Sequence, residues 1–393
     1  MKKYLLLIAV FLCIAMLGNT ETYKVKVESG DYDREGAIVS VKLNAKAEIA
    51  SVLVDGLRFP AQVQPMQNGG IKIWWVMQPL PANQIKEYEV ELGKETNLMP
   101  FQWSDSNGKS QDLLLGDRPV LRYMHTPFDA NDIENTKKPF HHVFDPSGTQ
   151  LITKGVGGKY SHHRGIFFGY NKISVGDQMF DIWHAKNGEH SIHKETLYEF
   201  ANQFVGGHVV RIDWNDKEGN PFIEETRWIC AVRQPQGQIL IDFRSTLKSV
   251  RGDIHLDGDR QHAGAQFRPA QEVAEHEETT RYLRPQAWSK LPEDKQINDE
   301  DYQDLPWNSV KYTVGGKRYT VAYLTDPKNP EGAKFSERLY GRFGEFFPYD
   351  ITEDKPLRVH YQWWIVEGDN VTREEIERRY QNLANPPKAT VIE

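Results

Sequence analysis

The sequence predicts an all-β protein, in which a small β-sandwich is followed by a large antiparallel β-sandwich and one C-terminal helix. Two observations support this fold class. Short runs in which apolar and polar residues alternate recur along the chain, and clusters of Gly, Pro, Asn and Asp separate them. Such alternation is typical of strands with one buried face. One segment near the end of the chain has the apolar spacing of an amphipathic helix.

The first domain is expected over residues 21–107. Its runs include YKVKVESG, AIVSVKL, IKIWWVM and EYEVEL, and turn residues separate them in GDYDREG, MQNGG and LPANQ. Val25 and Val27 fall on the same side of the first predicted strand. This pattern indicates a small antiparallel β-sandwich. Of the neighbours Trp74 and Trp75, we expect one to pack inward and the other to cover a sheet face.

The second domain is expected over residues 108–393, where runs such as HVVRIDW, EETRWICAV and LRVHYQWWIV lead to the final helix. Thr372 followed by Glu375 has the spacing of a capping box, which marks the start of a helix. One apolar stripe follows at helical spacing: Ile376, Tyr380 and Leu383. We expect this helix to pack on the outside of the sandwich, away from any catalytic residue.

Residues 1–20 have the pattern of a secretory signal peptide. Lys2 and Lys3 form a basic start, and the apolar run from Leu5 to Leu17 is too short to span a bilayer. Small and polar residues follow at 18–20, where cleavage is expected. The mature protein is therefore predicted to be periplasmic or secreted, with nothing to hold it in a membrane.

The mature chain is predicted to be acidic and without an internal disulfide. The sequence has 48 Lys and Arg against 55 Asp and Glu, and loss of the two leader lysines would leave a net charge of −9. Such a charge argues against nucleic acid as a partner, because neutralisation of phosphates dominates that affinity. Cys230 is the one cysteine outside the leader, so burial of apolar surface must hold the fold together.

The chemistry of the chain concentrates in one stretch of 34 residues that begins YSHHRG and ends HSIH. It contains six titratable side chains that suit a site: His162, His163, Arg164, His184, His190 and His193. Histidine titrates near neutral pH and binds metals, and arginine holds carboxylates with a planar fork of donors. If the HHR run is an extended strand, His162 and His163 point to opposite faces, so that one faces a cleft and the other is structural.

Other site types are not indicated. The sequence has no Gly-rich phosphate loop, no GxSxG motif and no CxxC pair. The histidine spacing matches no zinc signature, so a metal is possible but weakly indicated, and the cofactor stays open. Aromatic residues make up 11% of the chain, and aromatic rings beside polar groups suit the apolar and hydroxyl faces of sugars.

The blocks SHHRGIFFGY and FDIWH resemble the HHRG core of a bacterial exported family labelled PmoA-like, or methane oxygenase-like. The blocks GDRPVLRY, QHAGAQFR and ERLYGRFGEFFPYD follow the order of that family, so the resemblance spans residues 115–368. It implies a sandwich similar to galactose mutarotase and a setting among carbohydrate-degrading enzymes. The oxygenase label itself fits poorly, because membrane methane monooxygenase subunits consist of transmembrane helices and this chain is predicted to be all-β.

Together, the residues and the resemblance predict an exported carbohydrate-active enzyme, a hydrolase or lyase that acts on a glycan or sugar derivative by His/Arg acid-base chemistry. His163 is expected to be the general acid/base and Arg164 to bind an acidic or hydroxyl-rich substrate. The further candidates are His162, His193 and His262 for catalysis, and Trp183, Arg268 and Tyr361 for substrate binding. Two alternatives stay open: a glycan-binding protein without catalysis, and a His-ligated metal oxygenase as the family label suggests.

Overall fold

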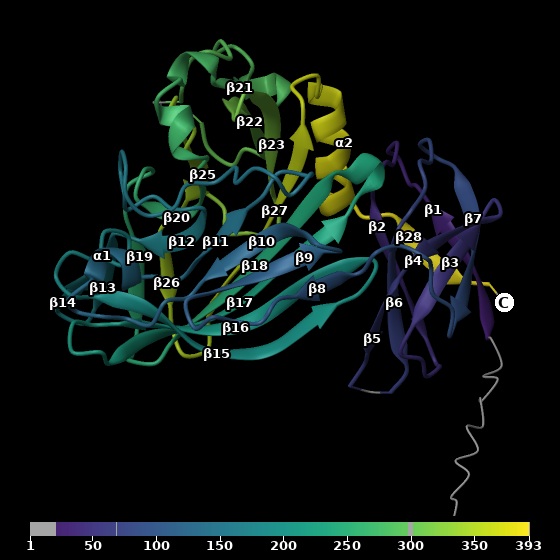
Figure 1. The fold of residues 1–393 in the computed structure, drawn as a ribbon, viewed down its shortest axis with the longest axis horizontal. Helices are drawn as coiled ribbons and strands as arrows, with labels where there is room; N and C mark the ends of the chain where they lie inside the picture. The colour runs from purple at the N-terminus through teal and green to yellow at the C-terminus, as the bar shows by residue number, and fades with distance from the viewer. Residues whose placement is uncertain (1–20, 68, 298–301, 393) are drawn as a thin grey trace, which may run out of the picture.

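The computed structural model describes residues 21–67, 69–297 and 302–392. The expected signal peptide over residues 1–20 lies outside this range. Strands are the main secondary structure of the described chain, they pair antiparallel with one another, and a helix follows the last strand of the large sandwich (Figure 1). The predicted all-β class, with a small and a large sandwich and one C-terminal helix, is confirmed. None of the helices in these ranges is both long and apolar enough to cross a membrane.

Two sheets form the small sandwich. The five-stranded sheet contains, in spatial order, β28 (Lys388–Val391), β1 (Thr22–Glu28), β7 (Ile85–Leu92), β3 (Ala50–Val54) and β4 (Leu57–Pro60). The three-stranded sheet contains β2 (Ile38–Leu43), β6 (Ile71–Val76) and β5 (Gln62–Pro65). Val25 and Val27 of β1 are fully buried in the core between these sheets, as the alternation predicts. Trp75 is buried in the same core, and Trp74 points the other way.

The sheets divide the chain differently from the expected boundary at residue 107. β8 (Phe101–Trp103) pairs with β9 (Ser110–Leu115) and so belongs to the large sandwich. The turn residues 104–107, which suggested a domain boundary, connect these two strands. At the other end, β28 pairs with β1, with Val25 opposite Val391, so the end of the chain returns to the small sandwich. The long-range pairing of β28 with β1 leaves no signal in local sequence patterns.

Two eight-stranded sheets face each other in the large sandwich. The first, called the β12 sheet here, contains in order β24 (Lys334–Glu337), β25 (Phe343–Phe346), β20 (Ala263–Phe267), β12 (Ile166–Tyr170), β11 (Phe140–Val143), β10 (Arg118–Met124), β9 and β8. The second, the β17 sheet, contains β15 (His190–Ala201), β16 (Val205–Asn215), β17 (Pro221–Arg233), β18 (Ile239–Ser249), β27 (Leu357–Glu367), β23 (Lys317–Thr325), β22 (Trp307–Val314) and β21 (Arg281–Leu283). A smaller sheet contains β14 (Gln178–Phe180), β13 (Lys172–Val175), β19 (Ile254–Asp257) and β26 (Tyr349–Ile351).

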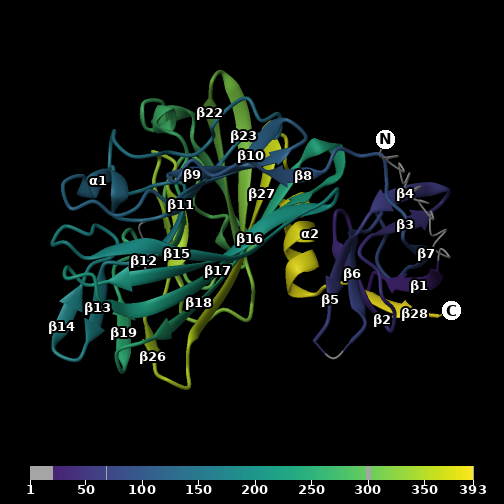
Figure 2. The same ribbon diagram turned by 60° about the horizontal axis from the view of Figure 1, so that its bottom comes forward.

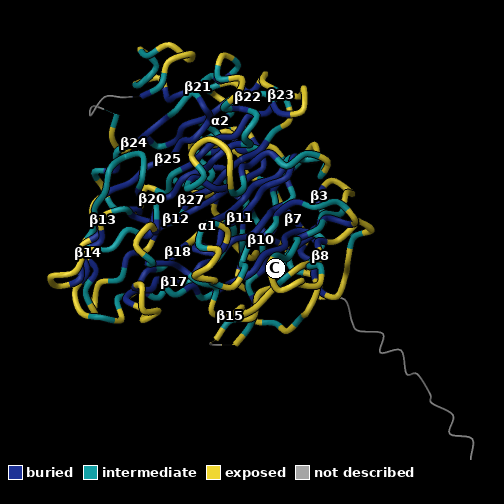
Figure 3. Tube along the Cα trace, turned by 60° about the vertical axis from the view of Figure 1, so that its left-hand side comes forward, coloured by how far each residue is buried: buried dark blue, intermediate teal, exposed yellow. Residues whose placement is uncertain are grey.

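Apolar side chains fill the space between the two large sheets. Phe168 of the β12 sheet meets Phe243 of the β17 sheet with ring centroids 6.3 Å apart, and Phe267 meets Trp363 at 6.4 Å. Figure 3 shows buried backbone through the strands of this sandwich and exposed backbone mainly at loops. The core therefore fixes the strands, and side chains of the connecting loops remain available for chemistry.

Helix α2 (Arg373–Ala384) packs between the two sandwiches (Figure 2). The predicted capping box is present: the Thr372 side chain accepts from the Glu375 N–H, and the Glu375 side chain accepts from the Thr372 N–H. Ile376 is buried against the outer face of the β17 sheet. Arg34 of the small sandwich donates to the Gln381 carbonyl at 2.9 Å, at the C-terminal end of the helix. The helix thus joins the two sandwiches and stays apart from the histidine-rich loops. A second, one-turn helix, α1 (Ile133–Thr136), lies in the loop before β11.

Candidate functional site

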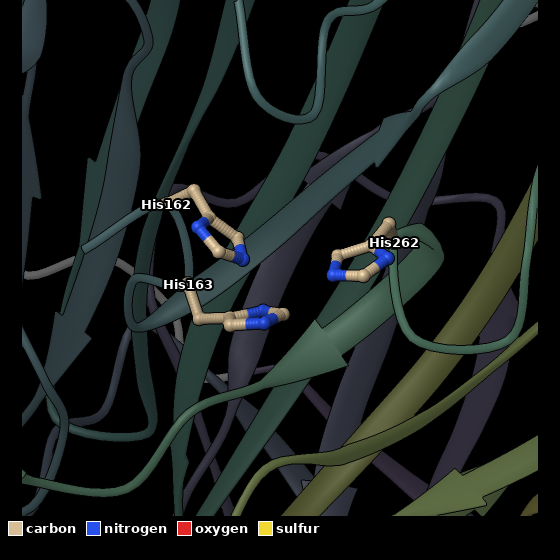
Figure 4. A group of neighbouring side chains, drawn as sticks. All are labelled: His162, His163 and His262. Carbon is tan, nitrogen blue, oxygen red and sulfur yellow. The ribbon is translucent and has the colours of Figure 1, made fainter. Parts of the chain in front are cut away.

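Four histidines from the loops that flank β12 and β20 converge, and we call them the histidine cluster: His162, His163, His184 and His262. Three loops carry them, namely the loop before β12, the loop after β14 and the loop before β20. Ring centroids are 4.3 Å apart for His162 and His163, 4.8 Å for His162 and His184, and 4.7 Å for His184 and His262. Figure 4 shows His262 across from the adjacent pair. His184 and His262 reach solvent, with 17% and 25% of their side chains exposed.

The expectation that His162 and His163 point to opposite faces of a strand is wrong. Residues 160–163 form a turn before β12, in which Tyr160 has a φ of +57° and the His163 N–H donates to the Tyr160 carbonyl at 3.0 Å. The turn directs both rings toward His262, as Figure 4 shows. Local strand alternation therefore does not apply to this pair.

Gly165 explains the glycine of the HHRG block. Its φ is +37°, and a Cβ at this position would lie 2.0 Å from the His141 carbonyl oxygen of β11. Only a residue without a side chain allows the turn to approach the neighbouring strand so closely. The close approach ends the histidine turn and starts β12 in register with β11.

Two of the histidines are paired with aspartates three residues earlier in the chain. The Nδ1 atom of His184 lies 2.7 Å from Asp181, and Nδ1 of His262 lies 2.9 Å from Asp259. These bonds orient the rings and leave Nε2 on the side away from the carboxylate. Burial tends to raise the pKa of Asp259. Hydrogen bonds from His262 and the Gln261 backbone outweigh burial and hold this pKa below its usual range.

The other two histidines each have a buried ring nitrogen without a partner. Nε2 of His162 and Nδ1 of His163 make no hydrogen bond to any described residue. Burial, with the charge of Lys138 second, lowers the pKa of His162 to about 2. Burial, with the charge of Arg342 second, places the pKa of His163 well below its usual value. Both rings are therefore neutral near pH 7 and can act as ligands or hydrogen-bond partners.

A buried lysine and a buried tryptophan lie beneath the cluster. The Lys138 ammonium donates to the His162 carbonyl at 2.9 Å and also to the Trp183 carbonyl, and it lies 4.1 Å from the Phe167 ring centroid. Trp183 contacts His163 edge-on at 5.6 Å and is 1% exposed. The expectation that Trp183 binds substrate is therefore wrong, because its ring is buried and packs against His163.

Two tyrosines border the cluster. Tyr160, which is 44% exposed, lies 4.7 Å from Tyr340, and both rings lie 6.2 Å from His163. The Lys159 ammonium lies 5.5 Å and 5.7 Å from their centroids. Arg268 lies behind Tyr340 at 4.8 Å and donates to its carbonyl. Arg268 is 1% exposed, so it contributes positive charge to the site and is shielded from direct contact with a ligand at the surface.

Arg164 does not face a substrate, contrary to expectation. Its side chain is fully buried and forms an ion pair with Glu134 at 3.0 Å. It also donates to the Glu134 carbonyl and, at 3.2 Å, to the Ser161 carbonyl within the histidine turn. Arg164 therefore holds the turn that carries His162 and His163, and its role is positioning.

His193 belongs to a second group of histidines. It lies on β15, where its Nδ1 is 3.1 Å from the Tyr123 hydroxyl and its ring is 5.2 Å from His125. Nearby, His141 and His208 bring their Nε2 atoms within 2.9 Å of each other. The strand hairpin of β13 and β14 separates His193 from His163 in sequence, and the fold sends the two to different groups.

Tyr361 is a core residue. It lies on β27 with no solvent exposure, and its ring packs 5.2 Å from Tyr323 and 6.3 Å from Trp363. The expectation that it binds substrate is wrong because its side chain points into the space between the two large sheets. Burial raises the pKa of its hydroxyl well above the usual value, with Glu345 adding to the rise.

Sequence reasoning missed both tyrosines and Asp259 of this site. A signal for the aspartates does exist: the runs DIWH and DRQH share the spacing Asp-x-x-His at Asp181 and Asp259. Three residues bring the carboxylate back to the ring within one turn. Tyr340 had no such signal, because it reaches Tyr160 across 180 positions of chain.

Comparisons with known proteins give a family and a likeness to solved structures. Comparison with curated protein sequences found no match. A similar solved structure is that of a protein in the glycosyl hydrolase family 38 from Enterococcus faecalis, with a TM-score of 0.46 and 8% identity. The match covers 95% of this chain and 47% of that chain, so this chain spans about half of its length. Residues 110–381, which include the whole histidine cluster, match the model of the "Family of unknown function (DUF6807)", and this chain belongs to that family.

Proposed function

We propose that this protein is an exported carbohydrate-active enzyme, a hydrolase or lyase that acts on a sugar derivative at the histidine cluster. One observation carries the proposal: three loops bring four imidazole rings together where His184 and His262 still reach solvent. A purely structural cluster would pair its buried nitrogens, since an unpaired buried polar group costs about 1–3 kcal/mol. His162 and His163 each keep one such nitrogen unpaired within the described chain. This supports a role in binding or catalysis.

His184 is the best-placed group for proton transfer. Asp181 accepts from its Nδ1–H at 2.7 Å, so the neutral ring offers Nε2 as the proton acceptor. A carboxylate fixes the tautomer of the histidine in hydrolytic triads in the same way. His163, the residue expected for this role, is 3% exposed and has a strongly lowered pKa, so it suits substrate or ligand binding better.

The surroundings favour an acidic sugar. Lys159 lies beside the two bordering tyrosines, and Arg268 and Arg342 add positive charge near His163. An exposed aromatic ring such as Tyr160 can stack on the apolar face of a sugar ring. A carboxylated sugar would gain from both features, and a neutral sugar from the aromatic ring alone.

Binding is tested first with glucuronic acid and glucose, which differ mainly in the carboxylate. Saturation-transfer NMR on the purified mature chain is expected to show stronger contact with glucuronic acid. Tyr160→Ala should weaken the contact. The matched control is His255→Ala, because His255 also pairs with an aspartate, Asp350 at 2.6 Å, but is 49% exposed and lies on β19, outside the three loops that carry the cluster. Equal signals in all three proteins would place the sugar elsewhere.

Turnover is tested next with polygalacturonate and starch as acidic and neutral polymers. Reducing-end release reports hydrolysis, and ultraviolet absorbance of unsaturated product reports elimination. Cleavage that His184→Ala abolishes and His255→Ala preserves supports the enzyme. Sugar binding without turnover of either kind would instead favour the glycan-binding alternative.

A further inference from the structure

We infer that His162, His163 and His262 form a binding site for one divalent transition-metal ion of the zinc type. The site is part of the histidine cluster, and metal binding itself does not depend on the sugar chemistry proposed above. One nitrogen from each of the three rings lies within 4.8 Å of the other two. Figure 4 shows the three rings around a common space.

The spacing is close to that of a three-histidine metal site. Zinc–nitrogen bonds of about 2.0–2.1 Å in a tetrahedral site place the nitrogens about 3.3 Å apart. The rings must therefore move inward by roughly an ångström on binding. His162 and His262 are both partly exposed, and rotation of these two side chains can supply this movement.

In two of the three rings, the nitrogens of the site are free of hydrogen bonds to the described chain. Nε2 of His162 and Nδ1 of His163 are buried and make no hydrogen bond to a described residue. In His262, Asp259 accepts from Nδ1–H at 2.9 Å and leaves Nε2 for the metal. A carboxylate behind a histidine ligand is the usual outer support of a zinc site.

His184 lies beside the three proposed ligands, with its ring 4.8 Å from His162 and 4.7 Å from His262. The side chains of His184 and His262 reach solvent, so we expect a small molecule to have access to the ion. Three protein ligands and one open position are typical of catalytic zinc sites, which bind water or a substrate oxygen there. If the proposed function holds, the ion would polarise a sugar oxygen beside His184.

Positive side chains near the site oppose binding of a cation, and two aspartates favour it. Lys138, Arg268 and Arg342 lie close enough to lower the pKa values of the cluster histidines. Asp181 and Asp259 supply two negative charges on the other side of the rings. Three imidazoles select zinc, cobalt or nickel over magnesium and calcium, which prefer oxygen ligands.

The test uses the full mature chain, stripped with a chelator and reloaded with zinc, cobalt, nickel, magnesium or calcium. Elemental analysis is expected to find one zinc or cobalt ion per chain, and cobalt should give the visible spectrum of a tetrahedral site. Magnesium and calcium should not bind. Asp259→Asn should lower the affinity for zinc about 10- to 100-fold, because it removes the support of His262.

The variants decide whether the three histidines are the ligands. His262→Ala should lose the ion and the cobalt spectrum, and His255→Ala should keep both. His163 is nearly fully buried, so His163→Ala could fail to fold for reasons unrelated to metal binding. His262 is partly exposed, and His262→Ala then decides whether these histidines bind the ion. Retention of zinc by folded His262→Ala, or an absence of zinc from the wild type, overturns the inference. Sugar turnover by a wild type that binds no metal would overturn the metal site alone, and metal binding without any sugar contact would overturn the proposed function alone.

Discussion

His360 makes the stability of this protein depend on pH in the alkaline range. Its ring lies between two carboxylates on the outer face of the β17 sheet, with Nε2 2.9 Å from Asp242 and Nδ1 2.7 Å from Asp326. Burial opposes the charge, but the two aspartates, Asp242 first, raise the pKa of His360 from 6.5 to about 9. The pKa of Asp242 is lowered by the same interaction, so the two shifts describe one contribution to stability.

The size of the effect follows from linkage. A folded-state pKa of about 9 against 6.5 in the unfolded chain corresponds to about 3 kcal/mol of stability. The sign follows from the direction of the shift: the folded state binds the proton more tightly, so the contribution is complete below pH 6.5. It is lost as the pH rises through 9.

The measurement compares the wild type with His360→Gln by denaturant unfolding at pH 6 and pH 10. The difference in the free energy of unfolding between the two proteins should shrink by about 3 kcal/mol at pH 10. His255→Gln is the control, because His255 is exposed and its loss should make no comparable difference. If the difference in the free energy of unfolding between His360→Gln and the wild type is the same at both pH values, the charged pairing of His360 with the two aspartates is refuted.

Three further changes test the fold around the site and the small sandwich. Gly165→Ala should lower the melting temperature by several degrees in calorimetry, because its Cβ would meet the His141 carbonyl at 2.0 Å; an unchanged melt would contradict the described turn. Arg164→Ala should cost about 1–3 kcal/mol in denaturant unfolding, since it leaves buried carbonyl groups unpaired; no loss would return Arg164 to the surface of the site. Trp75→Ala should cost about 3–5 kcal/mol and the partly exposed Trp74→Ala clearly less, and equal losses would contradict their assigned faces.

Local patterns predicted the strands and the helix well because each depends on nearby residues. Val25 and Val27 are buried where alternation placed them, and the capping box of Thr372 and Glu375 forms as expected. The return of β28 to β1 escaped prediction, because a pairing over more than 360 positions depends on packing of the whole chain.

The sequence predicted the central histidines of the site, but not the turn that carries two of them or the fate of His193. His162, His163 and His262 do come together, although a turn with a positive φ at Tyr160 replaces the expected strand. Sequence proximity also suggested His193, but a hairpin and a change of sheet take it to Tyr123. Residues near each other in sequence share a site only if the turns between them bring their side chains together. The turn at residues 160–163 has no strong sequence signature.

The central claim is that the histidine cluster is the working site of the protein, and His184→Ala tests it most directly. His184 is partly exposed and forms its one ring hydrogen bond with Asp181, so its removal should leave the melting temperature within a few degrees of the wild type. Turnover of the polysaccharide that the wild type cleaves should fall about 100-fold or more in the same sample. A His184→Ala protein that melts much earlier, with unchanged turnover by the folded fraction, would contradict the claim and make the cluster part of the scaffold.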